Sequence, residues 1–254
     1  YGKNSVPVNL TISEKVKNLY LVDNEKTTLL CTRCNSFSKN VNFKDGQHDI
    51  KIIASDNASN NISREISFFV DSKNPQIIKL NLKNNTKTNS TFFDVTYNEA
   101  FLEGVNFYYQ VDNNLNVIGL DCLSGRKVHC NLSLSSSGLD GKDVTYYFEV
   151  FDKIRSVYSK KQQIKLDFTA PTITILDPDE TNFNTRRIRF DISSNEKLSS
   201  LTYKNNGGNF KPLCSRCTAF NRTISFTNGT HNIIFKAVDI AGNSNTFTRT
   251  FSAA

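Results

Sequence analysis

The chain has 254 residues, of which 38% are hydrophobic and 22% charged, and its formal net charge is +7. No run of eighteen apolar residues occurs, which excludes a transmembrane helix, and five Pro and eleven Gly are too few for a collagen-like or low-complexity chain. The basic residues are scattered and form no stripe, so nucleic acid is not expected as a partner. No signal peptide is visible, and we expect a mature or trimmed protein whose targeting segment has been removed.

The first residues alternate between apolar and polar, as a half-buried strand does: Val8, Leu10 and Ile12 are apolar, and the strand ends at Glu14. Further strands are expected over residues 19–22 and 41–43, with a cysteine-bearing turn between them. The stretch that begins at His48 predicts another strand, which ends in a tight turn at Asp56 because an Asx side chain can bond the backbone there.

The same unit occurs three times. A shift of 183 positions places His231, Asp239 and Phe251 on His48, Asp56 and Phe68, and a shift of 96 places Asp152 on Asp56 and Asp167 on Asp71. The first two units each close with an Asp followed by a Pro, Pro75 and Pro171, and proline ends ladder pairing. We therefore predict three domains, at residues 1–73, 74–169 and 170–254.

Each unit has about seven short strands, turns every eight to twelve residues and no helical periodicity. This pattern predicts an all-β chain of three tandem antiparallel sandwiches of immunoglobulin type, arranged as a rod, with fibronectin-III topology as the alternative. Domain 2 has the one elaborated segment, a predicted loop over residues 117–140, which is the best candidate for a recognition loop.

The phrase G-x-H-x-I-x-x-x-A-x-D-x-A-G-N, followed by a strand, an Asp and a Pro, resembles the tandem immunoglobulin-like repeats of prokaryotic cell-surface proteins. With a short Cys-x-x-Cys before it, it is most similar to archaeal surface proteins. The resemblance is good in domains 1 and 3 and loose in domain 2, where Lys153-Ile-Arg155 replaces the Ala-Gly-Asn turn. It implies an extracellular stalk, surface-layer, filament or adhesin role and no catalytic activity.

Six cysteines form three local groups: Cys31 with Cys34, Cys122 with Cys130, and Cys214 with Cys217. The repeat argues for one disulfide within each domain, because Cys130 matches Cys34 while its partner has moved to Cys122 and the pair still exists. An even, paired set implies an oxidising, extracytoplasmic setting. The alternatives are a zinc site that joins the two Cys-x-x-Cys pairs and free redox thiols.

Metal ligands are not expected from the sequence. His48 and His231 recur at one framework position and predict a hydrogen bond at the start of a strand, and Asp56, Asp152 and Asp239 predict turn caps. The alternative is interdomain Ca²⁺, for which Asp71 and Asp167 at the joints are the candidate ligands, but no stretch of sequence gathers the six to eight oxygens that the ion needs.

Eight N-x-S/T sequons are glycosylation candidates, only slightly more than chance gives for this Asn-rich chain. They lie at Asn9, Asn57, Asn61, Asn84, Asn89, Asn131, Asn221 and Asn228.

No motif for a nucleophile elbow, a zinc protease, a Walker loop or a dinucleotide site occurs, so neither an enzyme nor a cofactor is expected. The expected function is an extracellular structural subunit of a surface layer, stalk or filament, which associates with its own copies or with adjacent surface domains. The rival is an adhesin that binds through loops of domain 2, and a weaker one is a spacer joined to a secreted enzyme.

Domain 1 is shorter than its neighbours at its start. Pro75 to Glu99 spans 99 − 75 = 24 positions, whereas Tyr1 to Glu14 spans 14 − 1 = 13. The difference corresponds to one strand and its turn, so domain 1 is expected to lack its first strand. Either the sequence is cut from a longer array, or a neighbouring subunit inserts a strand there.

Overall fold

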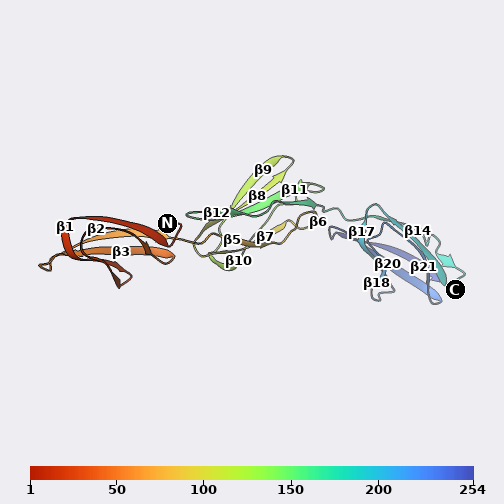
Figure 1. Ribbon diagram of the computed structural model, residues 1–254. Coiled ribbons are helices and arrows are strands. Elements are labelled where there is room, and N and C mark those ends of the chain that lie inside the picture. The colour runs from red at the N-terminus through yellow and green to blue at the C-terminus, as the bar shows by residue number, and fades with distance from the viewer.

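The computed structural model describes all residues from 1 to 254 and contains strands only. Three sandwiches lie end to end in a bent rod (Figure 1). The N-terminus lies beside the contact between domains 1 and 2, and the C-terminus lies at the far end of domain 3 (Figure 1). The chain contains no helix that is long and apolar enough to cross a membrane.

Domain 2 shows the complete unit. Its strands are β5 (Gln76–Leu80), β6 (Thr86–Thr88), β7 (Phe92–Glu99), β8 (Leu102–Val111), β9 (Asn114–Leu120), β10 (Gly125–Ser133), β11 (Asp143–Asp152), β12 (Ser156–Tyr158) and β13 (Gln162–Leu166). One sheet has the order β10-β7-β5, and the other has the order β6-β13-β11-β8-β9, with β12 paired to β11. Only β6 and β13 pair in parallel. This is an immunoglobulin-like or fibronectin-III-like sandwich.

Domain 3 repeats this arrangement. Its strands are β14 (Ile173–Asp177), β15 (Asn182–Phe183), β16 (Arg187–Ser194), β17 (Leu198–Asn205), β18 (Lys211–Ser215), β19 (Ala219–Ser225), β20 (Gly229–Asp239) and β21 (Ser244–Ala253). The sheets have the orders β14-β16-β19 and β15-β21-β20-β17-β18, and β15 pairs in parallel with β21 as β6 does with β13.

Domain 1 has four long strands in place of the seven short ones that the pattern predicts: β1 (Ser5–Asp23), β2 (Lys26–Asn42), β3 (Gly46–Ser55) and β4 (Asn61–Val70). The register of β1 with β2 breaks between Thr11 and Val16, so the two strands predicted at Val8–Ile12 and 19–22 are two halves of β1. On β2 the break falls between Ser36 and Cys34, next to the Cys31–Cys34 disulfide. The four strands form one sheet of order β2-β1-β3-β4, which this break divides into two halves.

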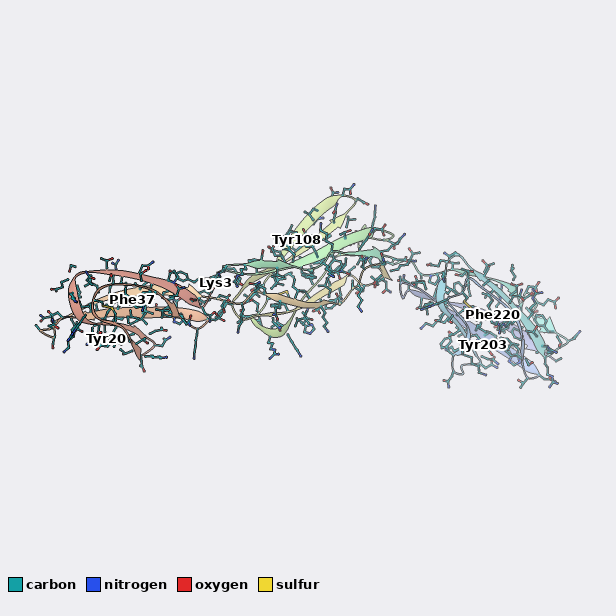
Figure 2. The ribbon with its side chains drawn as sticks, in the orientation of Figure 1. Lys3, Tyr20, Phe37, Tyr108, Tyr203 and Phe220 are labelled. Carbon is teal, nitrogen blue, oxygen red and sulfur yellow. A yellow bond between two sulfur atoms is a disulfide. The ribbon has the colours of Figure 1, made fainter.

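Each domain has its own core. Phe37 belongs to the core of domain 1, and Tyr203 and Phe220 belong to that of domain 3, whereas Tyr108 of domain 2 is only half-buried (Figure 2). The core of domain 2 is the most aromatic, with the rings of Phe93, Phe107 and Tyr146 packed together within 6 Å. Burial of these alternating apolar faces is what stabilises the sandwiches.

The segment 117–140 is mostly not a loop, contrary to the expectation from the sequence. It contains the end of β9 and the whole of β10, and only its residues 121–124 and 134–140 lie outside strands. The exposed positions of β10 are polar, whereas β9 exposes Leu115 and Val117 in place of the usual polar residues, so β9 does not show the expected alternation of a half-buried strand. The β8–β9 hairpin projects from the rod (Figure 1).

Candidate functional site

The first candidate site is the edge of domain 1. Residues 5–11 of β1 pair with β2 on one side only. In domains 2 and 3 the equivalent strands, β7 and β16, pair on both sides, with β5 and β14 supplying the second partner. Residues 5–11 of β1 therefore present a row of backbone groups that has no second partner among residues 1–254.

The apolar side chains at this edge of domain 1 are partly uncovered. Val8, Leu10 and Ile12 are half-buried in domain 1. Their counterparts in domain 2 are completely buried; these are Phe93, Val95 and Tyr97. The edge of domain 1 thus offers unpaired backbone groups beside an incompletely covered core.

The first residue of the chain is hydrogen-bonded in the same way as its equivalent in domain 2. The amide of Asp71 donates a hydrogen bond to the carbonyl of Tyr1 at 2.9 Å, as the amide of Asp167 donates to the carbonyl of Thr88 at 3.0 Å. Tyr1 thus occupies the place that Thr88, the last residue of β6, occupies in domain 2. Counterparts of β5 and of the rest of β6 would therefore precede Tyr1.

The second candidate site is joint 1, the contact between domains 1 and 2 around residues 70–75. The rings of Phe69 and Phe101 pack edge to face at 5.0 Å, and Lys153 lies over the ring of Phe69. The guanidinium of Arg155 donates to the carbonyl of Gly2. Both domains therefore contribute to a defined contact.

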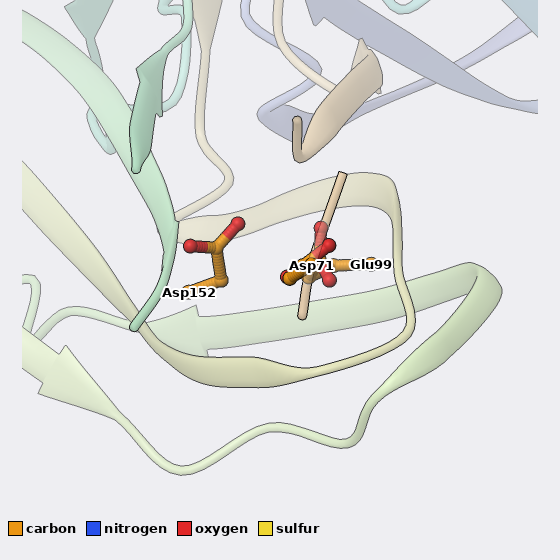
Figure 3. Close-up of side chains that lie close together, drawn as sticks. All are labelled: Asp71, Glu99 and Asp152. Atoms are coloured by element: carbon orange, nitrogen blue, oxygen red, sulfur yellow. The ribbon is translucent and has the colours of Figure 1, made fainter. Parts of the chain in front are cut away.

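Three buried carboxylates meet at joint 1. Asp71 comes from the end of domain 1, and Glu99 and Asp152 come from the ends of β7 and β11 in domain 2 (Figure 3). One carboxylate oxygen of each lies within 4.8 Å of one from each of the others. Burial raises the pKa of Glu99 and of Asp71, and the charge of Asp152 acts in the same direction on both.

Joint 2, around residues 166–171, repeats the cluster with Asp167, Glu196 and Asp239. Here Lys87 bridges two of the carboxylates, at 2.6 Å from Asp167 and 3.1 Å from Glu196. Asn243 closes the contact by donating to the carbonyl of Asp167 at 2.8 Å. Sequence reasoning missed the two glutamates and Lys87, although the Asn-Glu pair at the end of one strand in both domains was a usable signal.

The turn Asps cap their turns as predicted. Asp56 accepts from the amide of Asn60 at 2.8 Å, Asp152 accepts from the amide of Arg155 at 2.7 Å, and Asp239 accepts from the amide of Asn243 at 2.8 Å. The predicted histidine hydrogen bonds are also present: His48 donates to the carbonyl of Lys44, and His231 donates to that of Thr227, both at 2.8 Å.

The cysteines are bonded within their domains, as Cys31–Cys34, Cys122–Cys130 and Cys214–Cys217, and none is free. The residue before Cys34 and the residue before Cys217, Arg33 and Arg216, both have left-handed backbone conformations with φ of 52°. The two turns are therefore closely alike.

The Asn side chains of all eight sequons are exposed, and their glycosylation stays a prediction. Asn57, Asn84, Asn89 and Asn228 lie outside strands. The others lie within strands.

No family model matches the sequence, and the search of curated proteins found no similar sequence. Among solved structures, the chain is similar to fibronectin(III)-like modules of Clostridium thermocellum CbhA, with a TM-score of 0.45 and 10% identity over 70% of this chain and 93% of that one. A tetra-tandem repeat in the extending region of a large adhesion protein gives a TM-score of 0.41 and 15% identity over 98% and 70% of the two chains. The first three fibronectin domains of chicken CNTN1 give 0.42 and 10% over 99% and 96%.

Similarities at this level carry no argument about function. The strand order of the chain itself defines its class, a tandem repeat of immunoglobulin-like or fibronectin-III-like sandwiches.

Proposed function

We propose that the chain is an extracellular structural subunit of a cell surface, in a stalk, filament or surface layer, and that domain 1 accepts a β-strand from a neighbouring copy. The sequence phrase that resembles archaeal surface repeats supports this setting. Three disulfides and no free cysteine support an oxidising compartment outside the cytoplasm. The role needs no catalytic activity.

The observation that carries the proposal is the open edge of β1. A strand added there gains backbone hydrogen bonds and covers Val8, Leu10 and Ile12, the two sources of affinity in β-augmentation. The pairing in domain 2 gives the expected register: Ile77 lies opposite Tyr97, and Leu80 lies opposite Val95. A donor strand should therefore run antiparallel to β1 with apolar residues over Ile12 and Leu10.

The test is a graft that supplies the strand in cis. A copy of residues 75–87, carrying Lys87→Ser so that joint 1 gains no new cation, is joined to Tyr1. The grafted chain should unfold at a higher temperature and lose concentration-dependent assembly in sedimentation velocity. A matched graft, in which the copies of Ile77 and Leu80 are Ser, should do neither.

Two outcomes would contradict strand addition. The first is that the grafted chain assembles as the ungrafted chain does. The second is that the ungrafted chain is monomeric at every concentration, which would leave no neighbour to donate a strand.

A monomer would favour the alternative function, an adhesin or receptor-binding module that uses domain 2. This alternative is favoured by three exposed apolar residues on and beside β9. Leu115, Val117 and Leu123 are each more than half exposed. Apolar groups on a projecting hairpin are suited to contact a partner. Under that function, Leu115→Ser with Val117→Ser should abolish binding to the target surface and leave the oligomeric state unchanged.

A further inference from the structure

The two joints repeat the same three carboxylates but balance their charge differently. At joint 2 the free oxygens have partners: Lys87 binds Oδ2 of Asp167 and Oε2 of Glu196. The third carboxylate, Asp239, receives the side-chain amide of Asn243 on its Oδ2 at 2.8 Å. One ammonium and one amide thus provide hydrogen-bond partners for all three carboxylates of joint 2.

Joint 1 lacks both of these partners. The turn after Asp152 is one residue shorter than the other two, because the amide of Asp152 bonds Arg155, three positions on, whereas that of Asp239 bonds Asn243, four positions on. No Asn side chain is therefore available to Oδ2 of Asp152, and the position equivalent to Lys87 falls before Tyr1. Asp71, Glu99 and Asp152 take part in none of the ion pairs of the chain.

Two oxygens at joint 1 are consequently buried without a hydrogen-bond partner, Oδ2 of Asp71 and Oδ2 of Asp152. The residues are deeply buried: Asp71 is 1% exposed, Glu99 4% and Asp152 6%. Buried charges of one sign are strongly unfavourable unless a counter-charge meets them. At joint 1 the charge of Arg155 acts on Asp71, but Arg155 forms no ion pair with the cluster and its Nη1 is itself buried without a partner. No ion pair within residues 1–254 therefore neutralises these carboxylates, whereas Lys87 neutralises the same constellation at joint 2.

We propose that Asp71, Glu99 and Asp152 bind a calcium ion at joint 1, and that at joint 2 the ammonium of Lys87 takes the place of the ion. Three carboxylates without His or Cys form a hard-oxygen set, which suits Ca²⁺ and not Zn²⁺. Asp71 and Glu99 also line an open groove between the domains, which gives the ion and its water ligands a path.

The ligands come from both domains, so the ion links domain 1 to domain 2. With only three carboxylates from the protein, water completes the shell, and we expect an affinity on the order of 0.1–1 mM, as in other extracellular calcium modules. Glu99 and Asp152 thereby join Asp71 as ligands, whereas Asp167, the other candidate from the sequence, belongs to the joint that Lys87 already neutralises. The inference concerns a different surface from the strand-acceptor edge and stands or fails separately.

The experiment is calorimetric titration of the intact, chelator-treated chain with CaCl2 and, in parallel, with MgCl2. One saturable site for Ca²⁺ is expected, with at least tenfold weaker Mg²⁺ binding because a site of few, widely placed ligands does not impose octahedral geometry. Glu99→Gln retains the oxygen that accepts from the amide of Phe101 and removes the charge, and it should weaken calcium binding at least tenfold. The matched variant Glu196→Gln at joint 2 should leave the affinity unchanged.

A second pair of variants keeps the test decisive if Glu99→Gln fails to fold. Asp152→Asn keeps an oxygen for the amides of Ile154 and Arg155 and should also weaken binding at least tenfold, whereas Asp239→Asn should not. Absence of saturable heat up to about 10 mM CaCl2 would overturn the proposal, since that exceeds the affinity range of such sites. Equal calcium binding in the wild-type chain and in both joint 1 variants would overturn it too.

Discussion

The ammonium of Lys87, on β6 of domain 2, lies 2.6 Å from Oδ2 of Asp167 at the end of the same domain. It also reaches Glu196 of domain 3, so one side chain neutralises carboxylates from both sides of joint 2. The hydrogen bond with Asp167 is the main cause of a raised pKa of Lys87, which keeps the ammonium charged. Lys87 is therefore a structural counter-ion within the rod.

Replacing Lys87 by Met should destabilise the contact between domains 2 and 3 by about 1–3 kcal/mol, because two charge-assisted hydrogen bonds are lost and the carboxylates remain. Scanning calorimetry would measure this as a lower unfolding temperature. Lys165→Met, on the exposed side of β13, is the matched control. If both variants unfold at the same temperature, the ion pair contributes nothing.

The turn cap formed by Asp239 leads to a separate prediction about the stability of domain 3. Its carboxylate accepts from the amides of Gly242 and Asn243 and from the side chain of Asn243. Asp239→Ala should cost on the order of 1 kcal/mol through the loss of these bonds. The free energy of unfolding in urea tests this, with Asp179→Ala at an exposed position as the comparison. An equal cost for the two substitutions would contradict a capping role.

Much of the fold follows from local sequence pattern. The gapless match of His48, Asp56 and Phe68 to domain 3 and the Asp-to-Pro joints locate the repeat. The pairing of the cysteines follows from the same repeat. Such features are predictable because each is set within one turn or one pair of neighbouring strands.

The carboxylate clusters were not predictable in the same way. Asp71, Glu99 and Asp152 are far apart in sequence and belong to two domains, and only the joint brings them together. Lys87 carries no signal in the sequence, because β6 is only three residues long and has no apolar alternation. The turn of domain 2 did carry a local signal, since Arg155 ends it where the other domains have Asn60 and Asn243.

The disulfides should differ in what they contribute. Cys122–Cys130 closes a longer loop than Cys214–Cys217, with sequence separations of 8 and 3, and Cys130 is buried in the core of domain 2. By loop-closure entropy alone the longer loop should stabilise by roughly 0.5–1 kcal/mol more. Paired Cys→Ala variants, compared by unfolding in urea, measure the difference, and peptide mapping without reductant checks the three bonds. A linkage between two domains would contradict the local pairing.

The last prediction concerns pH and the two equivalent histidines. Nδ1 of His48 lies 2.9 Å from a carboxylate oxygen of Asp23, whereas Nδ1 of His231 lies 2.9 Å from the side-chain amide of Asn205. Burial alone would lower the pKa of His48, but the hydrogen bonds to Asp23 and to the carbonyl of Lys44, with the nearby charge of Asp49, raise it above the usual 6.5. The charged pair of His48 and Asp23 is thus built into domain 1.

A raised pKa in the folded state fixes the sign of the pH dependence. The stabilisation by the His48 pair is complete below a pH of about 6.5 and is lost as the pH rises through the raised pKa of the folded domain. Asp23→Asn, which copies the arrangement of domain 3, should lower the pKa of His48 and remove this dependence. Titration of the ring resonances of His48 by NMR, with amide exchange in β3 as the stability readout, measures the change. An unchanged pKa of His48 in Asp23→Asn would show that Asp23 does not control the titration.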